Sequence, residues 1–325
     1  MKYTTLQYKY YSRKKIEKDK EVPSYIGLGF FDGVHLGHQS LLSSCAEEAK
    51  KAHAVSTVVL LEPHPEIIIY NKNNLHLLTT LPEKIKRIRN IGIEQVIVLK
   101  FNKELKEITA EDFIIEILLN KFNMGAVFVG HNYNFGYQKK GDTILLKELS
   151  RKYSFKNYVV KPVSANKDIA ISSSAIRTLL KKGDIIEANR LLGYSYQISG
   201  EIIHGHKRGK EVLSFPTINL NISSDKFLPR NGVYIALINV ERCYYQGLVN
   251  IGFKPTFQVV SDSELLRPSV EAHIFNFDQD IYQKKANISL LKRIRDEKKF
   301  QTGKELAGQI REDQLAAEIF FQGQE

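Results

Sequence analysis

Apolar runs of strand length alternate with helical patterns from Ser24 to about Leu192, and this alternation constrains the fold more than any other feature. Five runs have the character of buried strands: SYIGLGFF, AVSTVVLLE, EQVIVLKF, GAVFVG and KNYVVKPV. The intervening segments, which include TAEDFIIEILLNKF, predict helices, and one of them begins at Thr80 with Glu83 at the spacing of a capping box. Strands that alternate with helices form parallel sheets covered on both faces. We therefore predict a doubly wound α/β domain.

The pattern changes after Tyr196. Short alternating segments follow, separated by Gly, Pro, Asn and Asp: YQISGEIIHG, NGVYIALINV, CYYQGLVNIG and SVEAHIFNF. Such segments are typical of an antiparallel barrel or sandwich, and a last helix is predicted over TGKELAGQIREDQLAAEIFF. Because 325 residues exceed what one hydrophobic core normally holds, we expect two domains, residues 1–183 and 184–325.

Composition narrows the cellular setting. Every apolar run is shorter than the roughly 18 residues needed to span a bilayer, and the basic, aromatic N-terminus lacks the apolar stretch of a signal peptide. Cys45 and Cys243 fall in different halves, which argues against a disulfide framework and a cysteine metal site. We expect a cytoplasmic, reduced protein. The net charge of +11 fits nucleic acid, an anionic surface or polyphosphate substrates, although most basic residues are interleaved with acids, as on a solvated face.

The loop GFFDGVHLGH leaves the first predicted strand and enters the first predicted helix. In a doubly wound sheet this is where ligands bind, beside helix N-termini that favour negative charge. Gly29, Gly33 and Gly37 allow close backbone approach to an anion, and His35 and His38 can donate hydrogen bonds to a phosphate. The alternative is structural: one histidine caps the helix and the other fills a gap in the core.

These residues resemble the HxGH signature of the nucleotidyltransferase superfamily, which transfers a nucleotidyl group from ATP and releases pyrophosphate. ISSSAIR, residues 171–177, resembles the ISSTxIR element of the same superfamily. The resemblance implies catalytic roles for His35, His38 and Arg177. It also implies that three serines with hydroxyl and backbone donors bind phosphate: Ser172, Ser173 and Ser174. The structural alternative is a serine that caps a helix, with one surface arginine.

Two further stretches resemble the flavin-nucleotide adenylyltransferase branch of that superfamily. They are LEPHPE, residues 61–66, and VGHNYNFGYQKKGD, residues 129–142, in which Asn132 and Tyr133 stand where Asp and Phe are usual. An Asn still hydrogen-bonds a nucleotide, and a Tyr still stacks. The resemblance implies a shared set of ATP- and flavin-binding residues in this half: Gly29, Phe31, Asp32, Gly33, Gly37, Pro63, His64, Asn132 and Phe135.

In the second half, GHKRGKEVLSFPTINL resembles the riboflavin kinase element GxxxGRxLGFPTANL, with Lys210 and Ser214 where Arg and Gly are usual. Thr217 and Asn219 share one face of an extended segment, and their oxygens could hold Mg²⁺ together with ATP phosphate oxygens. The resemblance also implies ATP- or flavin-binding roles for Gly205, Gly209, Lys210, Pro216 and Asn250.

Glu271, in SVEAHIFNF, matches the catalytic glutamate of these kinases. Strand alternation places it on the same face as His273, and we expect both to point inward. The alternative is a surface glutamate on an edge strand.

Together these blocks resemble the bifunctional prokaryotic riboflavin kinase/FMN adenylyltransferase family, from Tyr25 to about Phe320. The resemblance implies a Rossmann-like nucleotidyltransferase domain followed by an antiparallel β-barrel kinase domain with a C-terminal helix. It implies that riboflavin and ATP give FMN in the second half, and that FMN and ATP give FAD and pyrophosphate in the first. Mg²⁺ is the implied cofactor, ATP the co-substrate, and FMN and FAD the intermediate and product.

The partners implied are small molecules, with no nucleic acid and no membrane, for a monomer or weak homo-oligomer. Three alternatives stay open. One is an enzyme that retains a single activity, and a second is a flavin-binding regulator on the same fold. The third is an RNA-binding enzyme, because class I aminoacyl-tRNA synthetases share the HxGH loop.

Overall fold

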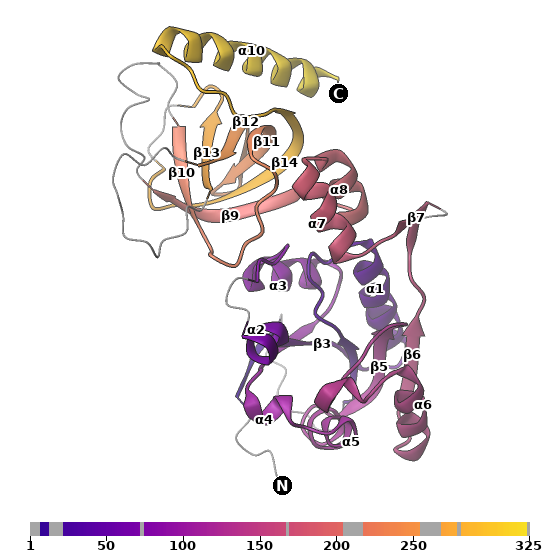
Figure 1. Ribbon diagram of the computed structural model, residues 1–325. Helices are drawn as coiled ribbons and strands as arrows, with labels where there is room; N and C mark the ends of the chain where they lie inside the picture. Colours follow the sequence, from indigo (N-terminus) through magenta and orange to yellow (C-terminus); the bar gives the residue numbers. More distant parts are fainter. Residues whose placement is uncertain are drawn as a thin grey trace. The chain divides into compact units, whose positions relative to one another are not determined.

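The apolar runs in the first half of the chain form a six-stranded sheet (Figure 1). In spatial order the strands are β1 (Tyr8–Ser12), β4 (Gln95–Lys100), β3 (Val55–Glu62), β2 (Ser24–Leu28), β5 (Met124–Gly130) and β6 (Lys156–Val160). All neighbours are parallel except β1, which pairs antiparallel with β4. Every residue of β2 is buried, as expected for a central strand covered on both faces.

The structure, a computed structural model, describes residues 7–12, 22–71, 75–166, 169–203, 217–253, 268–277 and 281–323. Its contacts divide the chain into two units, Met1–Ser173 and Ser174–Glu325. The first unit contains the sheet, and the second contains a barrel.

Helices cover both faces of the sheet. They are α1 (Leu36–Lys51), α2 (Pro65–Tyr70), α3 (Leu81–Asn90), α4 (Lys103–Lys106), α5 (Ala110–Asp112), η1 (Phe113–Leu119), η2 (Tyr137–Lys139) and α6 (Thr143–Lys152), and a short pair of strands, β7 (Ser164–Asn166) and β8 (Ile169–Ala170), follows β6. One core joins the sheet to α1 and α3, and the other joins its opposite face to η1 and α6. The capping box between Thr80 and Glu83 is present at the start of α3.

The sheet order reverses between β2 and β5. The chain builds β2, β3 and β4 outward in one direction, and then returns to place β5 and β6 on the other side of β2. Ligands of open α/β sheets bind at such a reversal, beyond the carboxyl ends of the strands. The loops that leave β2 and β5 therefore border the expected ligand site, and both carry predicted motifs.

The second unit is a closed antiparallel barrel with the strand order β10-β13-β12-β11-β14-β9. The elements are α7 (Ser173–Lys182, which begins at the boundary between the units), α8 (Ile185–Leu192), β9 (Tyr196–Ile203), β10 (Thr217–Ile222), β11 (Gly232–Val240), β12 (Cys243–Gly252), β13 (Ser269–Ile274), β14 (Lys285–Arg295) and α10 (Gly303–Gln322). Alternate strand residues fill the interior, among them Ile198, Ile238, Val249, Ala272 and Ile288.

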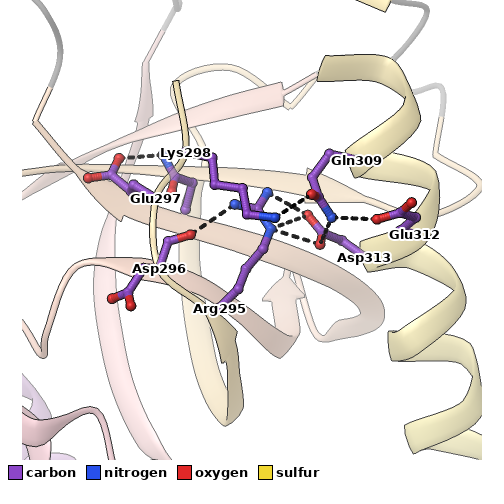
Figure 2. Close-up of polar contacts among 8 residues, drawn as sticks. Arg295, Asp296, Glu297, Lys298, Gln309, Glu312 and Asp313 are labelled. Carbon is purple, nitrogen blue, oxygen red and sulfur yellow. Dashed lines mark hydrogen bonds and ion pairs between the residues drawn. The ribbon is translucent and has the colours of Figure 1, made fainter. Parts of the chain in front are cut away.

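Helix α10 packs against the outside of this barrel. Ala317 of α10 lies in an apolar cluster with Val233, Ile235 and Leu248. An ion pair joins the end of β14 to the helix: Arg295 Nη2 lies 2.7 Å from Asp313 Oδ2, and Arg295 Nε lies 2.8 Å from Asp313 Oδ1 (Figure 2). Asp313 is buried. The two-point contact fixes both the position and the direction of the helix at this end of the barrel.

The predicted fold class is confirmed: a doubly wound sheet with helices on both faces, then an antiparallel barrel with a terminal helix. Some elements differ from prediction. The aromatic, lysine-containing segment of β1 and the whole of β14 are strands that were not predicted. The short elements α2, α4, β7 and β8 were also not predicted. Residues 113–119 form a π-helix within the predicted helix, with Asn120 N donating to Ile115 O. An apolar pattern of this length does not distinguish the two helix types.

Candidate functional site

The loop between β2 and α1 is held in a strained shape. Phe31 and Val34 have positive φ angles of 47° and 38°, which non-glycine residues rarely adopt. Two bonds hold the loop to the segment before α3: Gly33 N donates to Thr79 Oγ1 at 3.0 Å, and Thr79 N donates to Asp32 Oδ1 at 3.2 Å. Asp32 is buried. Strain maintained by surrounding contacts is typical of ligand-binding loops.

His35 and His38 lie side by side at the start of α1. Their rings stack with centroids 3.6 Å apart and an angle of 17° between planes. His35 caps the helix, because its Nδ1 accepts from the His38 backbone N at 3.4 Å. A Cβ at Gly37 would lie 3.3 Å from the His35 ring. Glycine at position 37 therefore leaves room for the ring.

Both imidazoles are neutral near neutral pH. Burial lowers the pKa of His35 to about 4. Burial also lowers the pKa of His38 well below its usual value, and the charges of His35 and Lys84 lower it further. Because Nδ1 of His35 accepts a hydrogen bond, its proton resides on Nε2, which is a donor. Among the described contacts, Nδ1 of His38 is buried without a hydrogen-bond partner. A ligand atom would satisfy it.

The ISSSAIR segment meets this loop through its first serines. Ser173 Oγ donates to Asp32 O at 2.8 Å, and Ser172, half-buried, precedes it. The structure therefore brings Ser172 and Ser173 to the histidine loop within the first unit. Ser174, exposed, and Arg177, half-buried, lie on α7 in the second unit.

An apolar cavity of about 440 Å³ opens at the same edge of the sheet. The ends of β2 and β3, the start of the segment after β4 and the turn after β5 contribute most of its wall. Its aromatic lining residues are Phe30, Tyr70, Phe101, Phe113, Tyr133, Phe135 and Tyr137. The Tyr133 and Phe135 rings stack with centroids 5.8 Å apart. An aromatic cavity of this size suits a flat, largely apolar ring system.

The remaining predicted residues of the first unit have mixed positions. Phe31 is buried and packs edge-on against the ring of His38. It therefore helps to hold that ring in place. His64 caps α2, and its ring lies 4.6 Å from that of Phe30 at the cavity. Pro63 precedes His64 through a cis Glu62–Pro63 bond. Asn132 is exposed, and its backbone carbonyl accepts a hydrogen bond from the side-chain amide of Asn134.

In the barrel, strand register gathers the predicted kinase residues on one face. Asn219 of β10 pairs with Glu271 of β13, and Glu271 pairs with Asn250 of β12. These three side chains therefore form a row across adjacent strands. Thr217 and His273 are paired beside them and share their face.

This face is the outside of the barrel, which corrects the prediction that Glu271 and His273 point inward. Val270, Ala272 and Ile274 alternate with them on β13 and are buried. These three apolar residues occupy the interior, and Glu271 and His273 are left half-exposed on the opposite face. The predicted sharing of a face is confirmed by the register.

Four predicted residues lie outside the part of the chain that the structure describes: Gly205, Gly209, Lys210 and Pro216, together with Ser214. Among the described residues, no group of three or more His, Cys, Asp and Glu side chains could hold a metal ion. Across the same residues, no helix is long and apolar enough to cross a bilayer.

Several residues of the site were not predicted. Thr79 and Lys84 act on the histidine loop from the segment LTTLPEK; the paired threonines before the capping box are the signal that marks this segment. Most aromatic residues of the cavity were also missed. Phe30, Phe101 and Phe113 come from separate segments, and each reads as an ordinary core residue in the sequence.

Comparison with known proteins matches both units. The family described as FAD synthetase matches residues 17–175, and the family described as riboflavin kinase matches residues 192–321. The bifunctional riboflavin kinase/FMN adenylyltransferase of Buchnera aphidicola from Acyrthosiphon pisum is 38% identical over 92% of this chain and 93% of its own. The Bacillus subtilis protein of the same description is 35% identical over 94% of both.

A solved structure supports the arrangement of elements over most of the chain. A Streptococcus pneumoniae protein described as a macrolide-efflux protein superimposes with a TM-score of 0.81 and 28% identity, over 92% of this chain and 94% of that one. Family matches on both units and relatives aligned over nearly the whole chain confirm the resemblance of the sequence motifs. The chain therefore belongs to the bifunctional riboflavin kinase/FMN adenylyltransferase family.

Proposed function

We propose that the chain makes FAD from riboflavin in two ATP-dependent steps. The second unit phosphorylates riboflavin to FMN, and the first unit transfers the adenylyl group of ATP to FMN and releases pyrophosphate. Family membership supports both activities. The observation that carries the assignment is the stacked, neutral pair His35 and His38, at the sheet reversal that also borders an aromatic cavity.

For adenylyl transfer, the phosphate of FMN attacks the α-phosphate of ATP, where negative charge rises during the reaction. Neutral His35 presents Nε2–H as a donor, and His38 supplies the second imidazole. Backbone groups of the loop at Gly29, Gly33 and Gly37 approach the phosphates. Ser172 and Ser173, which lie in the same unit, join the proposed ATP-binding set. Ser174 and Arg177 belong to the same proposal by their match to the ISSTxIR element, with the guanidinium as a two-point partner for phosphate oxygens.

The aromatic cavity is the proposed flavin site of the first unit. The isoalloxazine ring is flat and largely apolar, and the walls offer the stacked rings of Tyr133 and Phe135. The ring of His64 packs against Phe30, which lines the cavity, and Pro63 precedes His64. Asn132 lies in the turn after β5 that continues into the cavity wall. In this site Tyr133 stacks on the flavin ring, as Phe is expected to do in the usual motif.

For riboflavin phosphorylation, Glu271 is the proposed general base. It accepts the proton of the riboflavin 5′-hydroxyl as the hydroxyl attacks the γ-phosphate of ATP. Asn250, directly opposite on β12, contributes to binding the substrate. Gly205, Gly209, Lys210 and Pro216 belong to the same proposal by their match to the kinase motif.

Thr217 and Asn219 fit Mg²⁺ by the chemistry of their donors. A hydroxyl and an amide oxygen on one strand face are hard oxygen ligands. Because the described residues hold no carboxylate-rich cage, Mg²⁺ would be held by these two side chains together with ATP phosphate oxygens. Mg²⁺ held there would neutralise charge on those oxygens, and Thr217 and Asn219 would orient the triphosphate beside Glu271.

We further propose a cytoplasmic enzyme that acts as a monomer or weak homo-oligomer on small molecules, without nucleic acid or membrane. Cys45 and Cys243 are free thiols, which suits a reducing compartment. We place the boundary between the adenylyltransferase domain and the kinase domain at residues 183/184, between α7 and α8.

One assay tests the proposal. The purified chain is incubated with riboflavin, ATP and Mg²⁺, and FMN and FAD are separated by chromatography over time. FMN should rise first and then fall as FAD accumulates. FMN without FAD would indicate an enzyme with a single activity, and bound flavin without either product would indicate a regulator. RNA that is retained on filters at physiological salt would favour the nucleic-acid alternative.

A further inference from the structure

The segment that follows β14 is held at two points by α10. Arg295 pairs with Asp313 as described above, and Lys298 Nζ donates to Gln309 Oε1 at 2.9 Å (Figure 2). Glu297 lies between these two anchors. Two side-chain contacts with α10 therefore flank Glu297, whose own side chain lies on the surface.

The carboxylate of Glu297 lies against the end of β12. It occupies the space that a side chain at position 252 would fill, because a Cβ built on Gly252 would overlap the carboxylate oxygens. The Asn250 amide Nδ2 donates to Glu297 Oε1 at 3.2 Å. Gly252 and Asn250 are two residues apart on β12, so they share the outer face of the barrel.

Asn250 also lies directly opposite Glu271, the proposed base. The outer face thus carries a continuous series from Glu297 through Asn250 to Glu271. An asparagine amide has two orientations that exchange its donor and its acceptor. A hydrogen bond from Nδ2 to a carboxylate is charge-assisted and favours one of them. In that orientation Oδ1 of Asn250, an acceptor, is the atom left for a ligand.

We propose that Glu297 is a positioning residue for riboflavin phosphorylation. It fixes the amide of Asn250 so that Oδ1 accepts a hydrogen bond from a hydroxyl of the riboflavin ribityl chain, beside Glu271. Helix α10 braces Glu297 through Arg295 and Lys298. The inference deepens the proposed kinase function and rests on it.

The first test compares Glu297→Ala with Glu297→Gln in the full chain. The alanine change should lower kcat for riboflavin phosphorylation by about ten- to a hundred-fold, the usual effect of losing a partner that orients a ligating group, and leave KM for ATP nearly unchanged. The glutamine change keeps an acceptor oxygen and should recover most of the rate. Glu312→Ala is the matched control, because Glu312 accepts from Gln309 on the far side of the same network.

A second test reaches Glu297 from the strand. Gly252→Ala places a methyl group where the carboxylate lies and should displace it, with a similar fall in kcat. In a Glu297→Ala background the space is empty, so adding Gly252→Ala should cost little more. Such non-additivity is expected when two changes break one interaction. FAD formation from supplied FMN should stay constant in every variant, because it is assigned to the first unit. Thermal unfolding of the second unit serves as the control of folding.

An unchanged kcat in Glu297→Ala would overturn the inference. A Glu297→Gln chain as slow as Glu297→Ala would also overturn it, because the hydrogen bond would not be the cause. Should Glu297→Ala unfold the barrel, Glu297→Gln and Gly252→Ala decide by the same criteria. Glu271→Gln is assayed in parallel. Full riboflavin phosphorylation by Glu271→Gln would exclude Glu271 as the base. If Glu271→Gln is slow and Glu297→Ala is as fast as the native chain, only the positioning role of Glu297 is excluded.

Discussion

Burial determines how His35 and His38 act. An imidazolium would attract phosphate strongly, but the low pKa values of both rings keep them neutral at the pH of a cell. In the proposed mechanism they therefore act by directed hydrogen bonds. The stacking of the rings follows from the same burial, since two charged rings at 3.6 Å would repel each other. The capping role of His35, one of the structural alternatives, is compatible with its proposed catalytic role because the cap uses Nδ1 and leaves Nε2 for a ligand.

Replacing His38 tests its role as a donor. His38→Ala should lower FAD formation from FMN by about a hundred- to a thousand-fold, the usual cost of removing one donor to a developing charge. Riboflavin phosphorylation by the same preparation should continue, because the reaction is assigned to the other unit. Both products are measured by chromatography. FAD production at the native rate would exclude the imidazole from the mechanism.

The depressed pKa of His35 has a consequence for stability. Between the unfolded pKa of 6.5 and the folded pKa of about 4, the unfolded chain binds the extra proton, so the free energy of unfolding falls as pH falls. His35→Asn keeps a capping acceptor but does not titrate. Relative to this variant, the native chain should lose about 3 kcal/mol over that window, measured by denaturant unfolding at several pH values. Parallel pH curves for the two chains would contradict the burial argument.

Glu271 is tested as the kinase base. Glu271→Gln keeps the shape and removes the proton acceptor, so riboflavin phosphorylation should fall by about a hundred- to ten-thousand-fold. ATP binding, measured by calorimetry, should be nearly unaffected, and FAD formation from supplied FMN should proceed normally. A near-native rate of FMN formation would mean that another group accepts the proton.

At the scale of elements, the Arg295–Asp313 pair between β14 and α10 is the most buried ion pair among the described residues. The side chain of Asp313 is 6% exposed and that of Arg295 is 17% exposed. Removing one partner leaves a largely desolvated charge, so Asp313→Ala should destabilise the second unit by about 3 kcal/mol. Scanning calorimetry of the full chain measures the shift.

The matched control for this prediction is Glu187→Ala on α8. In its ion pair with Arg190 the side chains are 30% and 42% exposed, and solvent-accessible pairs of this kind contribute less than about 1 kcal/mol. Equal shifts for the two variants would show that the Arg295–Asp313 contact is not buried in solution.

The elements also show what a pattern can and cannot predict. Period-two alternation correctly placed Glu271 with His273 and Thr217 with Asn219, because alternation is a local property of a strand. It could not tell which face turns inward. The inward face is set by closure of the barrel, which buries Val270 and Ala272 in the interior. The edge strand β1 was missed for a similar reason: its pairing with β4 depends on residues far along the chain.

At the scale of the whole molecule, each unit has its own core, so the activities should be separable. The fragment Ser174–Glu325 should fold and phosphorylate riboflavin. It keeps α8, whose Asn189 donates to Leu290 O at 2.9 Å and accepts from Tyr196 N at 2.7 Å. A fragment that begins at Tyr194 loses both bonds and should unfold at a lower temperature. A folded Ser174–Glu325 fragment that binds flavin and ATP yet forms no FMN would contradict the kinase assignment.

Some parts of the candidate site are contiguous in the sequence, and other parts combine residues from distant segments. The histidine loop and the serines of ISSSAIR are contiguous motifs, and sequence alone placed them at the strand ends where the structure has them. The aromatic cavity, the proposed flavin site, is built from single aromatic residues of separate segments. Their convergence is set by the sheet order, which no one segment contains. The Glu297–Asn250 contact joins β12 to the segment that follows β14 in the same manner.

The antiparallel pairing of β1 with β4 also sets an order of events during folding. Tyr8 lies opposite Leu99, so β1 cannot pair until β2, β3 and β4 have been made and assembled. Contacts between segments so distant in sequence form late and slow the overall rate. On a ribosome, the β1 segment would wait while the parallel strands join, and would then pair with the exposed edge of β4. The edge of the finished sheet is then β1, a five-residue strand that carries Lys9. Short edge strands with a lysine resist the edge-to-edge pairing through which nascent chains aggregate.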